Sequence, residues 1–342
     1  MKLQKIRITL VFLLILLFGS CSSSRNFLEV KKIKEYPKTE FVATLENPIP
    51  KNKNAVYCVT LLYAWNEVRN TLKTALEVPA ELKEAQKDLV LLNNSTSFKD
   101  VLDKSEYTVK GIIEGNSVKT EAEFNKSLPF EFELHSFDNE LIFEGKKVSS
   151  FGVFGEDKEA EKAIKILQYE NDDEFILKLK SKDKLHEIIL FKTQESFESF
   201  AQMNEKVQEK IDATSDEKYE EETAWKFHLS DKDEIVIPKF NFNIENNFTT
   251  IEGNTVRSIF PRQDYIIETA WQRTAFVMDE KGAKIESKAK VVMKSMAVLK
   301  PEVKHPKKMR FDKPFFVLLK KVDSTTPYFT IFVNNAELMV KE

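Results

Sequence analysis

The stretch from Gln272 to Met293 reads QRTAFVMDEKGAKIESKAKVVM, and its second half alternates between two kinds of side chain. With Ala283 as the first inward position, the inward side chains are small or apolar: Ala283, Ile285, Ser287, Ala289, Val291 and Met293. The outward side chains are mostly charged: Lys284, Glu286, Lys288, Lys290, Val292 and Lys294. Because successive residues of a strand point to opposite faces, the pattern predicts a strand with one buried face. A slip of one residue would bury four lysines and a glutamate, so the register is strongly specified.

The same period of two recurs outside this stretch. Alternating apolar residues predict strands around Phe130–Leu134, Leu141–Phe143, Phe175–Leu179, Ile235–Ile237 and Phe240–Ile244. Helical spacing is found in Asn54–Leu72, in a more polar stretch up to about Leu91, and in Ser196–Ala213. Helices first and many strands afterwards predict an α+β fold with large antiparallel sheets.

The composition is that of a folded domain. With 342 residues, 42% of them hydrophobic and 27 of them phenylalanine, the chain can bury a large core. One large domain or two modest ones would fit this length. The formal net charge is -3 and no basic face stands out, so nucleic acid is a poor candidate for a partner.

The N-terminus has the features of an export signal. Lys2, Lys5 and Arg7 precede the apolar run from Ile8 to Phe18. The small residues that follow lead into Cys21, which resembles the acylation site of a bacterial lipoprotein, although Phe18 stands where such sites usually carry leucine. The alternative is a plain secretory signal with an incidental cysteine.

We therefore expect a signal peptide over residues 1–20, a lipidated N-terminus and tether over 21–40, and one domain over 41–342. If Cys21 is acylated, Cys58 is the only other cysteine, and no disulfide can form within the chain. Cys58 lies in an apolar stretch and is expected to be a small buried hydrophobe.

Residues for enzyme chemistry are not recognisable. The histidines His135, His186, His228 and His305 are scattered, and none lies at metal-ligand spacing from another. The sequence has no phosphate-binding loop, dinucleotide glycine motif or nucleophile elbow. We expect no enzyme, no metal and no cofactor. A hydrolase is the most distant alternative, because its catalytic groups would have to meet only in space.

Three segments carry a resemblance to a known family. Gln272–Gly282 is similar to the strand and hinge that precede the reactive loop of serpins, with Glu280-Lys281-Gly282 in place of the hinge. Phe311–Leu319 (FDKPFFVLL) and Pro327–Asn335 (PYFTIFVNN) resemble the strands that follow the loop in that family. Weaker matches precede them in the same order at Pro129-Phe130, Ile166–Tyr169 (ILQY) and Ile237–Phe240 (IPKF).

The sequence also departs from the family. Phe124–Leu128 lacks the family's tryptophan, and the N-terminal half is shorter. The family's hinge continues in small residues, whereas this one continues with the charged pattern described above.

The resemblance implies a serpin-like fold and inhibition of a protease. A serpin loop is cleaved and then slides into the main sheet as a new strand. Glu280 and Gly282 would form the hinge, and the inward residues from Ala283 to Met293 would enter the sheet. Inserting loops of the family place the scissile bond fourteen residues beyond the hinge glycine, which gives Met296–Ala297. Lys294–Ser295 is the alternative bond, for a trypsin-like protease.

The expected partner is therefore a target protease, most of all a serine protease, with cysteine proteases as an alternative. We expect a monomer in the bacterial cell envelope, lipid-anchored on the periplasmic side or the outer-membrane surface, or else secreted. The competing interpretation is a non-inhibitory cell-envelope lipoprotein of the same fold, with a binding or structural role. In that case the alternating stretch would be an ordinary permanent strand.

Overall fold

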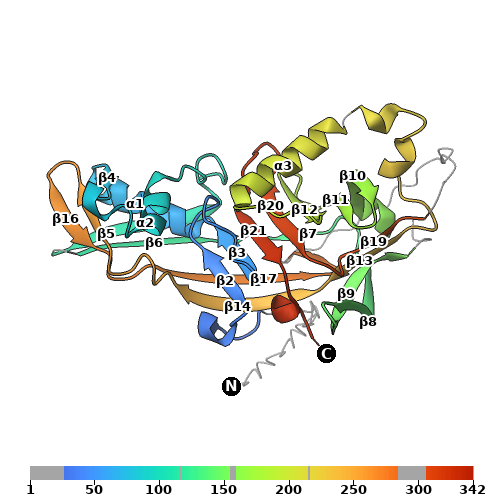
Figure 1. Cartoon of the computed structure of the whole chain (residues 1–342), viewed down its shortest axis with the longest axis horizontal. Coiled ribbons are helices and arrows are strands. Elements are labelled where there is room, and N and C mark those ends of the chain that lie inside the picture. Colours follow the sequence, from blue (N-terminus) through green and yellow to red (C-terminus); the bar gives the residue numbers. More distant parts are fainter. Residues whose placement is uncertain (1–26, 116, 155–158, 215, 284–305, 342) are drawn as a thin grey trace, which may run out of the picture.

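The computed structural model describes residues 27–115, 117–154, 159–214, 216–283 and 306–341 (Figure 1). Within these residues the chain forms three α-helices and several sheets, so the predicted α+β class is confirmed. Residues 284–305 follow directly on the predicted hinge and lie outside the described residues, as does Cys21.

The seven-stranded sheet forms the centre of the molecule. In spatial order its strands are β10 (Ile164–Asn171), β11 (Glu174–Leu179), β12 (His186–Lys192), β20 (Phe315–Lys321), β21 (Phe329–Val333), β3 (Asn54–Cys58) and β2 (Thr39–Val42). Every residue of β12 and β20 is buried. Their near-continuous apolar runs, EIILF and FFVLL, are typical of strands that are covered on both faces.

The five-stranded sheet covers one of these faces. Its order is β1 (Lys31–Lys32), β14 (Phe240–Asn247), β17 (Trp271–Asp279), β18 (Gly282–Ala283) and β7 (Leu128–Pro129). The two sheets meet through aromatic rings, with centroids 4.9 Å apart for Phe276 and Phe329 and 6.2 Å apart for Phe240 and Phe315. Such contacts add to the burial of apolar area that stabilises the core.

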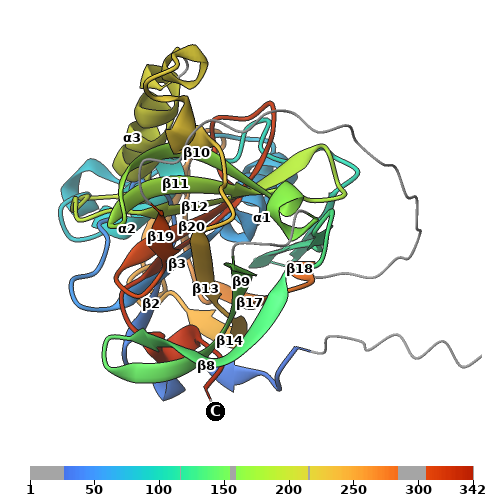
Figure 2. The same cartoon turned by 90° about the vertical axis from the view of Figure 1, so that its right-hand side faces the viewer.

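The opposite face of the seven-stranded sheet is covered by α3 (Phe200–Ala213) (Figures 1 and 2). Phe200, Met203 and Val207 point into the core at helical spacing. The side chain of Ser199 caps the helix by accepting a hydrogen bond from Gln202 N. The molecule thus has a helix layer, a central sheet and a second sheet.

Three smaller sheets and two helices complete the fold. A four-stranded sheet has the order β19 (Lys308–Arg310), β13 (Glu234–Pro238), β9 (Lys146–Phe154) and β8 (His135–Phe143). The order in the three-stranded sheet is β16 (Gln263–Ile266), β15 (Thr255–Ser258) and β4 (Leu76–Glu77), and β5 (Tyr107–Glu114) pairs with β6 (Ser117–Phe124). The helices are α1 (Thr60–Leu72) and α2 (Lys87–Asn94). Short 3-10 turns are η1 (Ile33–Glu35), η2 (Ala80–Leu82), η3 (Ala160–Ala163), η4 (Glu217–Tyr219), η5 (Ala224–Phe227) and η6 (Ala336–Leu338).

Several predicted elements differ from the structure. The predicted helix over Asn54–Leu72 is wrong in its first part, because Asn54–Cys58 form the buried strand β3 and α1 begins only at Thr60. The alternation in Phe130–Leu134 does not form a strand, since β7 ends at Pro129 and β8 begins at His135.

Part of the stretch for which a tether is predicted has regular structure. Lys31–Lys32 pair in parallel with Ile244 and Glu245 of β14, and η1 follows directly. β2 begins at Thr39, inside the same stretch, and joins the seven-stranded sheet.

Candidate functional site

The site of interest is the turn where β17 reverses into β18. Met278 pairs with Ala283 and Asp279 with Gly282. On its other side β18 pairs with β7, Gly282 with Pro129 and Ala283 with Leu128. Gly282, the last residue of the predicted hinge, and Ala283, the first predicted inward residue, thus lie between two strands of the five-stranded sheet.

Gly282 is required at its position by its backbone. Its φ is +120°, a conformation that residues with a Cβ rarely adopt. A Cβ at this position would lie 2.5 Å from Leu128 O and 2.6 Å from Phe130 N. The close approach of β7 therefore excludes any side chain here.

The turn itself is held by main-chain hydrogen bonds. Phe130 N donates to Lys281 O at 3.0 Å, and Leu134 N donates to Glu280 O at 2.9 Å. These bonds explain why Phe130–Leu134, although alternating in sequence, is not a strand: its backbone amides serve the hinge. Ala283, the first predicted inward residue, is 4% exposed.

An ion pair joins the hinge to Lys239, which lies between β13 and β14. Lys239 Nζ lies 2.7 Å from Glu280 Oε2 and also donates to Ser136 Oγ at 2.7 Å. Burial by itself would raise the pKa of Glu280, but the hydrogen bond and the charge of Lys239 outweigh it and lower that pKa. The carboxylate is therefore held in its charged form.

Beyond β18, the edge of β17 has no strand beside it among the described residues. In the described part of the chain, no strand pairs with Trp271–Val277 on the side away from β14. β6 likewise pairs only with β5 among the described strands, and it leads through residues 125–127 into β7. The edge of β17 away from β14 and the edge of β6 away from β5 thus both lack a partner among the described strands.

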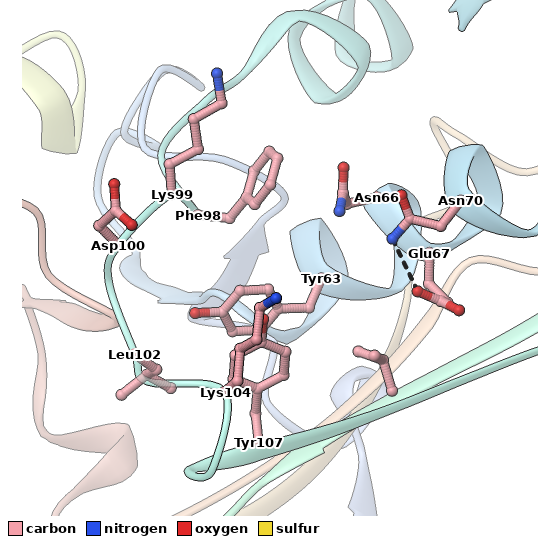
Figure 3. A pocket seen from close by; sticks show the side chains of 11 residues that line it. Tyr63, Asn66, Glu67, Asn70, Phe98, Lys99, Asp100, Leu102, Lys104 and Tyr107 are labelled. Atoms are coloured by element: carbon pink, nitrogen blue, oxygen red, sulfur yellow. Dashed lines mark hydrogen bonds between the residues drawn. The ribbon is translucent and has the colours of Figure 1, made fainter. Parts of the chain in front are cut away.

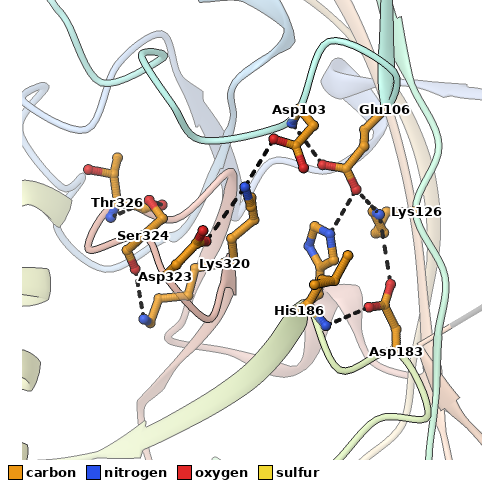
Figure 4. A network of polar contacts seen from close by, with 11 residues as sticks. Asp103, Glu106, Lys126, Asp183, His186, Lys320, Asp323, Ser324 and Thr326 are labelled. Atoms are coloured by element: carbon orange, nitrogen blue, oxygen red, sulfur yellow. Dashed lines mark hydrogen bonds and ion pairs between the residues drawn. The ribbon is translucent and has the colours of Figure 1, made fainter.

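A polar network ties this linker to the seven-stranded sheet (Figure 4). Glu106, which precedes β5, is paired with Lys126 of the linker and with His186 Nε2 of β12 at 2.8 Å. Burial opposes the charge of Glu106, yet these partners lower its pKa to about 2. Asp183 lies 3.8 Å from Lys126 and extends the network.

The chain after residue 305 is fixed by a buried ion pair. Lys307 Nζ lies 2.7 Å from Asp233 Oδ2, and both side chains are 1% exposed. Lys307 Nζ also donates to the carbonyl oxygens of His228 at 3.0 Å and Trp225 at 3.2 Å. Asp233 accepts further hydrogen bonds from Lys307 N at 2.8 Å and Ser230 N at 3.0 Å. β19 then pairs in parallel with β13.

A cavity of about 340 Å³ lies beside α1, among residues 98–109 (Figure 3). The rings of Tyr63 and Tyr107 stack at its base with centroids 4.0 Å apart, and Phe98 meets Tyr63 edge-on at 6.4 Å. Asn66 and Glu67 of α1 line the opposite side. Of the predicted site residues that the structure describes, Glu280, Gly282 and Ala283, none lines it.

The described residues hold neither a metal-binding cluster nor a membrane-crossing helix. No group of three or more histidine, cysteine, aspartate or glutamate side chains there could hold a metal ion. No helix in that part of the chain is long and apolar enough to cross a membrane. Cys58 is buried, and burial raises the pKa of its thiol.

The structure places only part of the predicted site. Glu280, Gly282 and Ala283 are described and lie together at the hinge. The remaining predicted residues lie outside the described residues: Cys21, Ile285, Ser287, Ala289, Val291, Met293, Lys294, Ser295, Met296 and Ala297. Sequence reasoning missed the hinge's partners, Lys239 and Leu128–Pro129. The only signal for Lys239 is its place in the IPKF segment.

Comparison with known proteins gives similarity at the level of structure. No family model and no curated protein matches the sequence. Solved structures that are similar include Serpin48, described as a highly specific serpin in the insect Tenebrio molitor, with 13% identity, a TM-score of 0.35 and coverage of 82% of this chain and 74% of that one. Tengpin, a thermophilic serpin in its native state, has 13% identity, a TM-score of 0.36 and coverage of 74% and 62%. Thyroxine-binding globulin in complex with thyroxine has 13% identity, a TM-score of 0.34 and coverage of 83% and 77%.

Proposed function

We propose that this protein is a serpin-like inhibitor that traps a serine protease by letting its cleaved loop enter the five-stranded sheet. The single observation that carries the proposal is the register of β18. Continued beyond Ala283, that register sets Ile285 opposite Phe276, Ser287 opposite Thr274 and Ala289 opposite Gln272 of β17. Directly opposite residues of antiparallel strands lie on the same face of a sheet.

The buried face of β17 agrees with this register. Gln272, Thr274, Phe276 and Met278 are buried, whereas Trp271 and Arg273 are exposed. The small and apolar residues of the loop would therefore face the core, and Lys288 and Lys290 would lie opposite the exposed positions. The loop residues that the sequence predicts to point inward are therefore those that this register sets opposite buried residues of β17.

β6, which would border the inserted strand on the side away from β17, gives the same result. The pairing of Ala283 with Leu128 continues to Ser287 opposite Phe124 and Val291 opposite Thr120 of β6. The ring of Phe124 packs edge-on against the buried Tyr328, and Thr120 Oγ1 donates to Ala64 O of α1. These side chains face the interior, as the proposal requires.

The energetics favour insertion. Burial of Ile285, Val291 and Met293 would each contribute roughly 1.5–3 kcal/mol. Each new main-chain hydrogen bond on the open edges of β17 and β6 adds about 0.5–1.5 kcal/mol. The sum is large enough for insertion to be irreversible once the loop has been cut.

The covalent step belongs to the protease. Its serine Oγ bonds to the carbonyl carbon of Met296, the Met296–Ala297 bond breaks, and the serine proton leaves on the amino group of Ala297. Insertion of the new strand then carries the acylated protease with it. We assign Lys294–Ser295 as the second possible bond. We also propose acylation of Cys21 and a monomer on a bacterial envelope membrane.

The proposal is tested by incubating the purified protein with chymotrypsin, elastase, subtilisin and trypsin. Trapping gives an SDS-resistant complex with at least one of them, and mass spectrometry of the released C-terminal fragment identifies the cleaved bond. The nicked protein should also unfold at a higher temperature than the intact one. Plain degradation by every protease would instead favour the non-inhibitory lipoprotein.

A matched pair of variants tests the register. Ala289→Arg places a charge on the inward face, so it should abolish the SDS-resistant complex while cleavage continues. Lys288→Arg changes the outward face and should trap as the parent does. Equal behaviour of the two variants would contradict the proposed pairing with β17.

A further inference from the structure

The segment that leads from Cys21 into the domain is attached to the sheet almost at once. Only residues 22–26 separate Cys21 from Phe27, where the described chain begins. A fully extended chain spans at most about 3.6 Å per residue, so Phe27 lies within roughly 20 Å of Cys21. A lipid on Cys21 would thus keep this part of the domain beside the membrane surface.

From Leu28 onward the chain is bound along β14. Asn243 Nδ2 donates to Leu28 O at 2.8 Å, and Leu28 N donates to Asn241 Oδ1 at 3.3 Å. β1 then adds its two backbone pairs to Ile244 and Glu245, and Lys32 forms an ion pair with Glu245. The distance between Cys21 and the sheet is therefore limited by the few residues that precede Phe27.

This edge of the sheet carries exposed apolar side chains. Leu28 is 49% exposed and Val30 is 43% exposed. They lie two residues apart in the segment that leads directly into β1. The exposed Lys31 and Lys34 flank them, together with the exposed Glu29 and Glu35, so the charge of the segment is nearly balanced. An apolar pair with a polar rim suits the interface of a lipid bilayer.

We infer that the β1 edge of the five-stranded sheet is a membrane-contact surface, with Leu28 and Val30 touching the bilayer to which Cys21 is anchored. The occupant is the phospholipid surface, because the short connection to a lipidated Cys21 would hold this edge of the sheet beside the bilayer. The inference rests on the proposed acylation of Cys21. It does not depend on protease trapping, since β1 and the hinge lie at different places in the sheet.

The test supplies the anchor chemically, so that a failure of native acylation is not confused with a failure of this inference. A chain that begins at Cys21 is coupled through its thiol to a maleimide lipid in vesicles of phosphatidylcholine and phosphatidylglycerol. The buried Cys58 does not compete for the reagent. The same chain with a blocked thiol, mixed with the same vesicles, serves as the uncoupled control.

The measurement is the rate at which each lysine is acetylated by a water-soluble reagent, followed by mass spectrometry. Lys31 and Lys34 should react several-fold more slowly in the coupled protein, whereas Lys206 on α3, across the central sheet, should not change. Equal rates for Lys31 and Lys34 in both samples would overturn the inference.

Two variants separate contact from mere proximity. A long Gly/Ser insertion between Asn26 and Phe27 should restore the fast reaction of Lys31 and Lys34, because the domain can then leave the surface. Leu28→Ser combined with Val30→Ser should also restore much of it, since the apolar contact is lost. Slow reaction in the serine variant would show that these side chains do not touch the bilayer, and would overturn that assignment.

Discussion

The two ends of the stretch between Ala283 and Pro306 are held in different ways. At the hinge, the chain is fixed by a two-residue strand, main-chain hydrogen bonds and the ion pair of Glu280 and Lys239, whose side chains are 18% and 16% exposed. At the far end, the side chains of Lys307 and Asp233 are 1% exposed. Lys307 Nζ also donates to two backbone carbonyl oxygens, and Asp233 accepts from two backbone amides.

This difference bears on the proposed insertion. The hinge strand would be extended by further pairs beside β17, without breaking the ones that exist. Release of Lys307 would instead leave a buried carboxylate without its partner, which is strongly unfavourable. The arrangement suits a segment whose N-terminal side enters a sheet while its C-terminal side stays in place.

The largest effect is expected from breaking the far end. Asp233→Ala leaves the ammonium of Lys307 buried without a counter-ion, so we expect a loss of about 3–5 kcal/mol in the free energy of unfolding. Urea denaturation measures it. Lys308→Ala, at an exposed neighbouring side chain, should change stability by less than about 0.5 kcal/mol. A small effect in both variants would remove the contrast between the two ends.

An intermediate effect is expected at the hinge glycine. Gly282→Ala combines an unfavourable φ with contact against the backbone of β7, so it should cost about 2–3 kcal/mol. Gly253→Ala is the matched control, because its φ is +79° but a Cβ there meets nothing within 4 Å. That variant should cost only about 1 kcal/mol. If thermal denaturation gives the same loss in the free energy of unfolding for both variants, β7 does not approach Gly282 as closely as described.

The smallest effect is expected from the hinge ion pair, and it depends on pH. Glu280→Gln should cost about 1 kcal/mol at neutral pH. Because the folded protein lowers the pKa of Glu280, the contribution is present above the usual glutamate pKa of about 4.3 and is lost as the pH falls through the lowered value. The parent and the variant should therefore converge in stability as the pH falls below that lowered value.

Glu133→Gln serves as the reference for that experiment. Glu133 is an exposed residue 3.9 Å from Lys281, next to the hinge but outside its ion pair. Its substitution should change stability little at any pH. A pH profile of Glu133→Gln that matches that of Glu280→Gln would mean that the ion pair with Lys239 does not hold the hinge.

The strands of the core could be predicted from the sequence because their patterns are local. β11, β13 and β14 were expected from alternating apolar residues, and each is found at the predicted place. The class of the fold follows from such patterns together with the order of the elements. The apolar residues of Asn54–Cys58 also fit a period of 3.6 and so predict a helix, and only pairing with β2 and β21 makes this segment a strand.

The partners at the site could not be predicted, since they come from distant parts of the chain. Nothing local to Lys307 shows that it will meet Asp233, and nothing local to Gly282 indicates the approach of Leu128. β1 lies in a polar stretch without periodicity, and Leu28 just before it is held by asparagine side chains of β14 far along the sequence. Pairing over such distances is decided by the whole fold.

The position of β20 in the sequence has a consequence for the cut molecule. β20 lies between β12 and β21 in the central sheet, and it follows the predicted cleavage site. A nicked molecule would thus be a two-chain particle whose smaller piece supplies an innermost strand, so it should migrate as one species in a native gel. After complete denaturation, its recovery would be a second-order process that becomes slower on dilution, whereas the uncut chain refolds at a rate independent of concentration.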